Sequence, residues 1–217
     1  MKLDSNTITI LQNFQTINQS IVINPGSVIR TISPSGSVYA SATVSDVFEK
    51  MFAIYDLSKF LGILSLHKQS DIEFFDDHMI IDQDNYKVKY TYCSPELIVT
   101  PPDKQIVMPD SDLSFDLKSD IIQGIIKRMM IFGFSEIGFI GDGENLSIAA
   151  INTKNQSSDT SMSVVGNTSL TFKCIIEAEK LKLIPADYKV TISTQGLVHF
   201  HSDIVDYWIA TSTKSEF

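Results

Sequence analysis

The amino-acid sequence predicts an α+β protein made of two similar domains. Amphipathic helical stretches alternate with long β-rich runs, the order helix, strands, short helix, strands occurs twice, and a proline-rich segment separates the halves. At 217 residues the chain can give each domain a core of its own. We therefore predict an N-terminal domain over residues 1–104, a connector over 105–111 and a C-terminal domain over 112–217. No residue-level repeat is evident, so the shared order does not establish duplication.

The N-terminal half is predicted to open with a helix over residues 6–17. Ile10, Phe14 and Ile17 form its apolar stripe, and polar residues at positions 4–6 are suited to cap it. A second, short helix is capped by Asp56, and its inward face holds Leu57, Phe60, Leu61 and Leu64.

Most of the remaining N-terminal half reads as strands. Residues 21–45 are β-rich, and turn signals at 24–26 and 33–36 imply two hairpin connections. A strand begins at Met51 ahead of the short helix. Four consecutive strands are then predicted at 71–77, 78–84, 86–92 and 95–100. The proline-rich connector that follows carries an apolar insert, Ile106, Val107 and Met108.

The C-terminal half is predicted to open with an amphipathic helix over residues 117–130. Ser119 offers an N-cap oxygen, Asp120 suits the positive end of the helix dipole, and Lys127 with Arg128 suits the negative end. The apolar stripe recurs at steps of three and four, at Leu117, Ile121, Ile122, Ile125, Ile126 and Met129. The basic residues outside this stripe are either solvated charges that serve the dipole or part of a binding face.

The rest of the C-terminal half is again mostly β. A hairpin is predicted over 136–153, with its turn at 141–145, and strands over 161–176 turn at 166–167. A short helix over 177–184 is stopped by Pro185. Three strands complete the chain, at 188–194, 197–202 and 207–213.

The composition indicates a packed globular protein. Hydrophobic residues make up 43% of the chain and charged residues 20%, which is too few charges for a disordered chain. Cys93 and Cys174 stand in no C-x-x-C pairing, so neither a zinc site nor a disulfide framework is expected and a reducing interior is favoured. We expect no export signal and no membrane span.

The formal net charge of −9 argues against a conventional sequence-specific DNA-binding protein. Such proteins present basic surfaces that offset the phosphates. Any contact with nucleic acid would therefore be confined to one surface of this chain. Its distribution of charge matters more than its total.

The candidate catalytic and metal-binding residues are weak. Asp71, Glu73, Asp76, Asp77 and His78 resemble metal ligands but alternate with apolar residues, which favours a solvated hairpin. The segment 142–145 lacks the full ligand series of a calcium loop and is interpreted as a tight turn.

Two further histidines, His199 and His201, share one face of a strand as zinc ligands do, but no third ligand is evident. There is also no P-loop, G-x-G-x-x-G or G-x-S-x-G motif. Neither catalytic residues, a cofactor nor a metal is therefore expected.

Several patches along nearly the whole chain resemble one family, the sliding clamps, or DNA polymerase processivity factors, of T-even-type bacteriophages. The most specific is the long run Ala53–Leu66, AIYDLSKFLGILSL. The others are Met1–Leu3, Asn13–Asn18, Pro102–Lys104, Pro185 with Tyr188 and Lys189, and the ending Glu216–Phe217.

This resemblance implies two clamp-type domains per subunit and three subunits that close head-to-tail into a ring, with outer sheets and with helices lining the hole. Helix-borne cations would face duplex phosphates without reading bases. They are Lys2, Lys59, Lys118, Lys127, Arg128, Lys180 and Lys182. The first helix departs from the expected pattern because it shows Ser5, Asn6, Gln12 and Gln15 where clamp relatives are expected to carry lysines.

The resemblance also implies partners on an outer face: the replicative DNA polymerase, an ATP-driven clamp loader and late-transcription sigma-like and coactivator proteins. Ile106, Val107 and Met108 are the expected rim of a groove for partner peptides. Tyr90 and Tyr92 on one domain and Val164 and Val165 on the other are the expected subunit contact. The expected setting is the cytoplasm of an infected bacterial host.

Two other functions remain open from sequence. One is a β-rich structural or assembly protein of a virion, without a DNA role, whose basic helix faces are ordinary solvated surfaces. The other is a metal-dependent enzyme that uses the cluster between Asp71 and His78.

Overall fold

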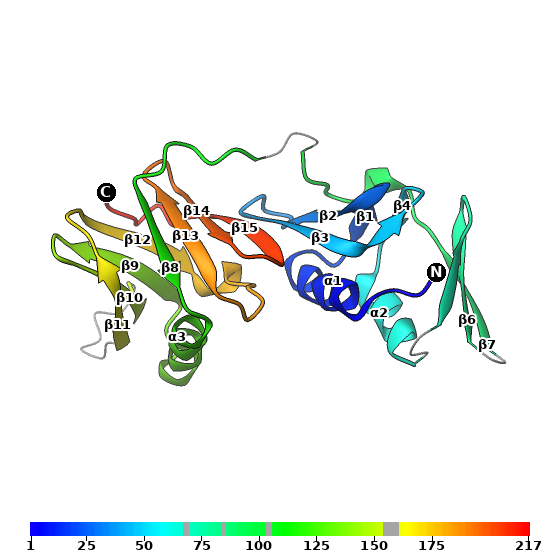
Figure 1. The fold of residues 1–217 in the computed structure, drawn as a ribbon, viewed down its shortest axis with the longest axis horizontal. Helices are drawn as coiled ribbons and strands as arrows, with labels where there is room; N and C mark the ends of the chain where they lie inside the picture. The colour runs from blue at the N-terminus through cyan, green and yellow to red at the C-terminus, as the bar shows by residue number, and fades with distance from the viewer. Residues whose placement is uncertain (67–69, 84–85, 103–105, 154–160) are drawn as a thin grey trace. The chain divides into compact units, whose positions relative to one another are not determined.

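The computed structural model describes residues 1–66, 70–83, 86–102, 106–153 and 161–217. The chain divides into two compact units, Met1–Lys104 (unit 1) and Gln105–Phe217 (unit 2), and each contains helix and antiparallel sheet (Figure 1). The predicted α+β class is confirmed. The predicted boundary at residue 104 lies outside the described residues. Among the described residues, no helix is long and apolar enough to cross a membrane.

Among its described residues, unit 1 contains two α-helices and three groups of paired antiparallel strands. The helices α1 (Ser5–Ile17) and α2 (Leu57–Leu66) contact each other, and α1 also contacts β3. The paired strands are β1 (Ile21–Ile23) with β4 (Phe52–Ile54), β2 (Gly26–Ile32) with β3 (Val38–Phe48), and β5 (Asp71–Phe74), β6 (His78–Gln83) and β7 (Tyr86–Thr91) in that order.

Both unit 1 helices begin at an aspartate cap. The Oδ1 of Asp4 accepts from the backbone N–H of Asn6 at 2.8 Å, and the Oδ1 of Asp56 accepts from that of Lys59 at 2.8 Å. The predicted inward faces are confirmed, because Ile10 and Phe14 of α1 are fully buried. Asn18 is the C-cap of α1. It is buried, and its side-chain amide donates to the carbonyl of Ile32 at 2.9 Å.

Two strand predictions for unit 1 are wrong. β1 pairs with β4 and not in a hairpin with β2, so only the turn at 33–36 joins a hairpin. The strand predicted at 95–100 is a 3-10 turn at Pro95–Leu97. Pro95 has no N–H to give to a ladder. The N–H groups of Leu97 and Ile98 close the turn locally by donating to the carbonyls of Ser94 and Pro95.

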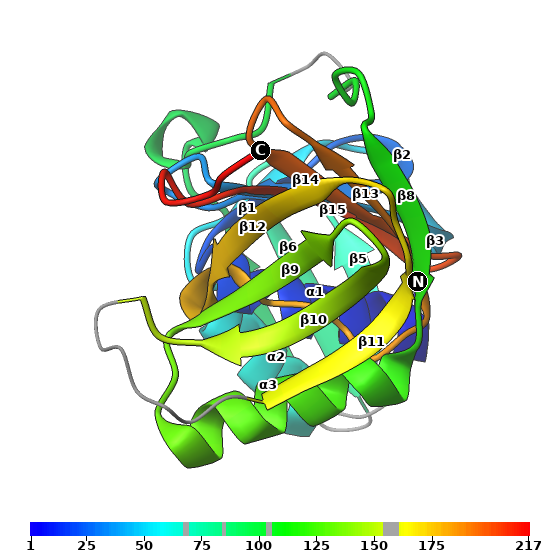
Figure 2. The same cartoon turned by 90° about the vertical axis from the view of Figure 1, so that its left-hand side faces the viewer.

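Unit 2 packs a helix and two antiparallel sheets. One sheet has the order β11 (Ser161–Asn167), β10 (Asn145–Ile151), β9 (Glu136–Asp142), β12 (Thr171–Glu177). In the other, β8 (Leu113–Leu117), β13 (Tyr188–Ser193), β14 (Leu197–His201) and β15 (Val205–Ala210) are neighbours. The rings of Phe139 and Phe200 lie 6.2 Å apart in the core between them. The helix α3 (Ser119–Phe132) contacts β10 and β11 (Figure 2).

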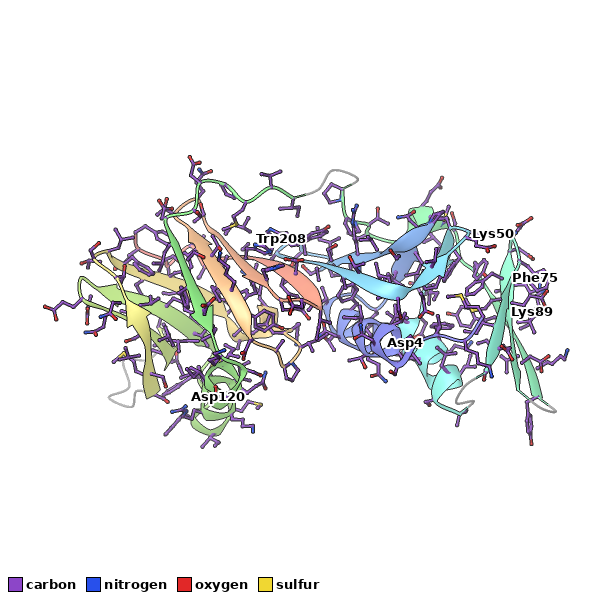
Figure 3. All side chains as sticks on the ribbon, viewed as in Figure 1. Asp4, Lys50, Phe75, Lys89, Asp120 and Trp208 are labelled. Carbon is purple, nitrogen blue, oxygen red and sulfur yellow. The ribbon has the colours of Figure 1, made fainter. Side chains whose placement is uncertain are left out.

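The start of α3 differs from the prediction. Leu117 ends β8, Lys118 is the N-cap, and no side-chain oxygen of Ser119 caps the helix. The Oδ1 of Asp187 instead accepts from the backbone N–H of Ser119 at 2.8 Å. Asp120 stands in the first turn as predicted, near the positive end of the dipole (Figure 3). The helix ends at Gly133, whose φ of 67° is left-handed.

The helix predicted over 177–184 is reduced to a 3-10 turn at Ala178–Lys180. Long-range hydrogen bonds hold the segment out of helical geometry. The N–H of Ala178 donates to the carbonyl of Ser135, and the N–H of Ile184 donates to the hydroxyl of Tyr207 at 3.2 Å. Leu181 and Ile184 were predicted to face inward, but both are only half-buried. The buried residue of this segment is Leu183.

Candidate functional site

On the two helices of unit 1, α1 and α2, the solvent-facing side carries a single lysine, Lys59. On α2, Lys59 is exposed on the side away from the buried residues Leu57, Phe60, Leu61 and Leu64. The sequence of α1 contains no lysine or arginine, as its departure from the expected family pattern indicated. Lys2 precedes α1, and its Nζ lies 3.9 Å from Asp71 Oδ2. At that distance, with both side chains exposed, the pair leaves the lysine available to other anions.

In unit 2 the corresponding charges lie on and beside α3. Lys127 is exposed opposite the buried stripe of Ile122, Ile125 and Met129. The Nε of Arg128 donates to the carbonyl of Gly124 at 3.0 Å, so the guanidinium lies back along the helix. A Cβ at position 124 would come within 3.0 Å of Arg128 Nη2, so glycine makes room for this arrangement.

The other three expected cations of unit 2 are placed differently. Lys118 Nζ lies 2.7 Å from Asp187 Oδ2, which raises the pKa of the lysine. Lys180 has a side chain only 16% exposed, with its Nζ 2.7 Å from Glu177 Oε2 and 3.1 Å from the carbonyl oxygen of Ala210. Lys182 is half-buried and follows the 3-10 turn. The sequence predicted an α-helix that carries both Lys180 and Lys182, and this is wrong: Lys180 ends the 3-10 turn and Lys182 lies beyond it.

The expected groove residues lie in a segment of unit 2 without helix or strand. Val107 is 82% exposed, and Ile106 and Met108 are half-buried. An apolar groove of about 120 Å³ lies elsewhere in unit 2, and Asp112 is one of its lining residues. Its apolar lining is Leu113, Leu170, Phe172, Ile192 and Phe217.

This groove was missed by sequence reasoning. The ring of Phe217 stacks on that of Phe172 with 6.3 Å between centroids, and the backbone of Glu216 pairs with Lys173. The only sequence signal was the ending Glu216–Phe217, which contributed to the family resemblance. The other apolar lining residues come from β8, β12, β13 and the residue before β12, and no local pattern connects them.

The four expected subunit-contact residues fall on or next to two strands at sheet edges. β7 is the outer strand of the order β5-β6-β7, and β11 is the outer strand of β11-β10-β9-β12. On β11, Val164 is 63% exposed and Val165 is half-buried.

The tyrosines near β7 instead pack inside unit 1. Tyr90 is 9% exposed, and its hydroxyl donates to the carbonyl of Asp56 at 3.2 Å. Tyr92 stacks on Phe52, and burial raises the pKa of its phenol to about 12.

The acidic cluster that suggested a metal enzyme does not converge. Asp71 and Glu73 are exposed on β5, whereas Asp76 is held by Lys50 Nζ at 2.6 Å and Asp77 Oδ1 lies 2.6 Å from His78 Nδ1. The interpretation of a solvated hairpin is confirmed. Asp142 likewise closes the β9–β10 turn, since its Oδ1 accepts from the backbone N–H groups of Glu144 and Asn145.

Among the described residues, only one group of potential metal ligands comes together: His199, His201 and Asp206, with ligand atoms within 4.8 Å of one another. The reading that the two histidines lack a third partner is therefore wrong. Asp206 was missed because it reaches them across the β14–β15 turn. Burial alone would raise the pKa of Asp206, but hydrogen bonds from the two imidazoles lower it below its ordinary value.

Comparisons with known proteins agree with this architecture. Residues 2–98 match the family model described as DNA polymerase processivity factor. The sliding clamp of Vibrio phage KVP40 is 31% identical over 97% of this chain and 99% of its own length, and that of Enterobacteria phage T4 is 28% identical over 99% and 98%. The solved structure of A. fulgidus PCNA bound to the C-terminal region of FEN-1 has a TM-score of 0.70 at 14% identity, with 96% of each chain covered. The chain therefore belongs to the sliding clamps of T4-like bacteriophages, a family of non-enzymatic DNA polymerase processivity factors.

Proposed function

We propose that this chain is the subunit of a homotrimeric ring that encircles duplex DNA and tethers the replicative polymerase. An ATP-driven clamp loader opens and loads the ring, which then serves as a mobile platform for late viral transcription. Family membership supports this proposal and argues against the virion-assembly and metal-enzyme alternatives. A closed ring retains DNA by topology, so it needs only weak contact with phosphates.

One observation carries the DNA part of the proposal. In a chain of net charge −9, the main amphipathic helix of unit 2 and the second helix of unit 1 each expose a lysine opposite a buried apolar stripe. Among the described residues, neither Lys59 nor Lys127 is in an ion pair with an acidic side chain. Such lysines are suited to loose, sequence-independent contact with a phosphate backbone.

Ring formation and retention are tested together. Light scattering at several concentrations is expected to give three times the 24.2 kDa subunit mass. After loading, the protein should remain on closed circular DNA and leave once the circle is cut. Equal loss from circular and linear DNA would contradict topological retention.

The role of helix charge is tested by reversing it. Lys59→Glu and Lys127→Glu are expected to reduce loading and polymerase run length, most strongly when combined. Lys189→Glu, which changes an exposed lysine on strand β13, is the matched control and is expected to have little effect. Equal loss in all three variants would show that total charge, and not the helix faces, governs contact with DNA.

Partner peptides are proposed to bind at the connector, with Ile106, Val107 and Met108 at the rim and the groove around Phe217 as the anchor pocket. The PCNA structure named above holds a C-terminal peptide region of its partner, which supports peptide docking on this fold. Fluorescence anisotropy with a short peptide that ends in apolar side chains should show binding. Phe217→Ala and Val107→Asp are expected to weaken it, and Leu97→Ala, an exposed leucine in unit 1, to leave it unchanged.

Subunits are proposed to meet by edge-to-edge pairing of β7 with β11 of the next copy. An exposed strand edge is a ready template for pairing, and a head-to-tail contact between different edges closes into a ring when the rotation permits. Tyr90 and Tyr92 would support β7 from within, whereas Val164 and Val165 would meet the neighbour. Val164→Asp is expected to give monomers in light scattering, whereas Leu97→Asp should leave the trimer intact.

A further inference from the structure

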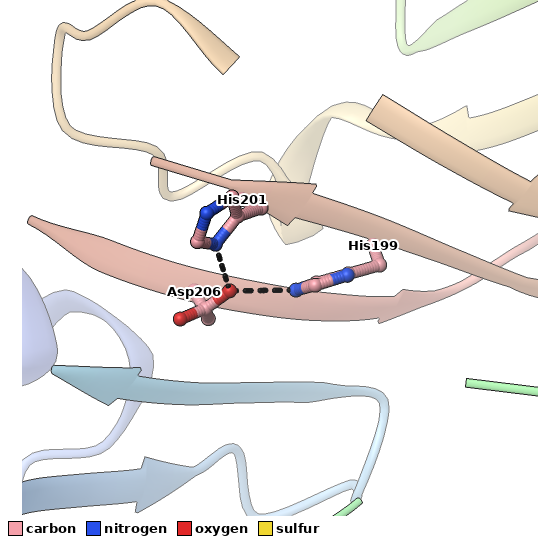
Figure 4. A group of neighbouring side chains, drawn as sticks. All are labelled: His199, His201 and Asp206. Atoms are coloured by element: carbon pink, nitrogen blue, oxygen red, sulfur yellow. Dashed lines mark hydrogen bonds and ion pairs between the residues drawn. The ribbon is translucent and has the colours of Figure 1, made fainter. Parts of the chain in front are cut away.

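The outer face of the β14–β15 hairpin gathers two imidazoles and a carboxylate. His201 lies directly opposite Asp206 in the strand register, and His199 lies opposite Trp208. Asp206 Oδ1 is 2.7 Å from His199 Nε2 and 2.8 Å from His201 Nδ1 (Figure 4). The neighbouring positions Val198, Phe200 and Tyr207 point to the core, so the three polar groups share the other face of the sheet.

We infer that His199, His201 and Asp206 form a binding site for one first-row divalent transition-metal ion, such as Zn²⁺ or Ni²⁺. Two imidazole nitrogens and one carboxylate oxygen are a donor set that these ions prefer over Mg²⁺ or Ca²⁺. Three protein ligands leave at least one coordination position for water or a further ligand. Nothing in the role of a DNA clamp requires such a site.

The backbone already holds the three ligands in place. Two residues on one strand and a third on the paired strand are positioned by the backbone ladder and not by a loop. The ring of His199 is further fixed by stacking on Trp208, with 4.4 Å between centroids and 9° between planes. The side chain of His201 is 53% exposed, which gives an ion a route from solvent.

Binding of an ion requires that protons on the two imidazoles move or leave and that the carboxylate of Asp206 shifts. In the metal-free geometry both nitrogens that face the carboxylate carry protons, because an ionised carboxylate only accepts hydrogen bonds. An ion needs the lone pairs of these nitrogens. A neutral ring meets this need when its proton moves through solvent to the other ring nitrogen, and a protonated ring releases one proton to the buffer. The carboxylate must also withdraw by roughly half an ångström, since ligand atoms about 2.1 Å from a tetrahedral ion are farther apart than a hydrogen bond.

The same geometry would arise if the triad were only a hydrogen-bonded network that ties β14 to β15. The two cases differ in one respect: a network that does not bind an added ion keeps its stability unchanged, whereas a site gains a cross-link when the ion binds. A bound ion should therefore raise the thermal stability of the full chain in proportion to its occupancy.

The chain provides its own reporter for the test, because Trp208 is its only tryptophan and contacts His199. Full-length protein treated with chelator and then dialysed should show saturable quenching of tryptophan fluorescence by Ni²⁺. Calorimetry with Zn²⁺ should give one ion per chain, and Zn²⁺ should raise the Tm. Asp206→Asn and His201→Ala are expected to weaken affinity about tenfold or more.

His78→Gln, which removes a histidine from unit 1, is the matched control and should bind as the unaltered chain does. Circular dichroism checks that each variant is folded, and exposed His201 gives a variant that is least disturbing to the core. Absence of saturable binding, or equal affinity in the unaltered chain and in folded His201→Ala, would reduce the triad to a hydrogen-bonded network and overturn the inference.

Discussion

Units 1 and 2 follow one order of elements but distribute charge and helix differently. In unit 1 the first helix has no basic residue and the second carries Lys59. In unit 2 the first helix carries Lys127 and Arg128, and the second is only a 3-10 turn. The comparison teaches that two units can share an order of elements and still carry their basic residues on different helices. The following predictions test how far the two units are equivalent.

The largest effect is expected from the two cores. Phe139→Ala in unit 2 and Phe14→Ala in unit 1 each remove a fully buried ring, which should cost about 3–5 kcal/mol. If each unit has its own core, hydrogen exchange should accelerate chiefly in the unit that carries the substitution. Uniform acceleration across both units in both variants would show one cooperative core instead.

A second effect is expected only in unit 2, where Glu136 forms a buried ion pair. Its side chain is 4% exposed and accepts from Lys214 Nζ at 2.8 Å and from the backbone N–H of Thr153 at 2.8 Å. Burial favours the neutral acid, but these hydrogen bonds lower the pKa of Glu136 below its ordinary 4.5. Glu136→Gln should cost about 1–3 kcal/mol at neutral pH.

The pH dependence of that contribution has a definite sign. Because the pKa is lowered on folding, the stabilisation is fully present above the ordinary pKa of 4.5 and is lost as the pH falls through the folded value. Thermal melts between neutral pH and acid should show this loss in the unaltered chain and a weaker one in Glu136→Gln. Parallel pH profiles would contradict the assignment.

A smaller effect is expected at the helix ends, which the units close by different means. Asn18→Ala removes the amide that bonds the carbonyls of Ile32 and Val99, at an expected cost of about 1–2 kcal/mol. Gly133→Ala forces a side chain into left-handed geometry, at about 1 kcal/mol. Denaturant midpoints should fall for both, whereas Gly62→Ala inside α2, with open space around it, should be neutral or stabilising.

The smallest effect separates the two helix starts. Asp56→Ala should cost about 1 kcal/mol because it removes the α2 cap. Ser119→Ala should cost less than about 0.5 kcal/mol because the N–H at that position is satisfied by Asp187. Equal losses in urea denaturation would show that Ser119 has a capping role after all.

Local patterns predicted most of the elements. Apolar residues at helical spacing located α1, α2 and α3, and the strands from β5 to β7 followed from β-rich runs between acidic turns. The failure at Pro95–Leu97 is local, but three others involve distant partners. β1 pairs with β4, Asp187 replaces the expected cap of α3, and Tyr207 holds Ile184 out of a helix. Periodicity reports which face of an element is buried, but it carries no information on what that face meets.

The candidate site followed the same rule. The exposure of Lys59 and Lys127 could be predicted because both oppose apolar stripes on helices that the structure contains. Lys180 was predicted to be a solvent-facing cation on a helix. Its side chain is instead held by Glu177 and by the carbonyl of Ala210, thirty residues away in the sequence. The groove at Phe217 and the third member of the histidine cluster depend on register across strands, which a single sequence does not display.

The folded-back guanidinium of Arg128 has a consequence for motion along DNA. Gly124 weakens α3 by about 1 kcal/mol relative to alanine, yet its missing Cβ leaves room for Arg128 Nη2 beside the helix. A guanidinium bonded to its own helix in this way reaches less far toward individual phosphates than an extended side chain does. On the proposed inner surface it would therefore bind any single phosphate only weakly, which favours sliding. A fully extended side chain would pair more tightly with each phosphate that the ring passes.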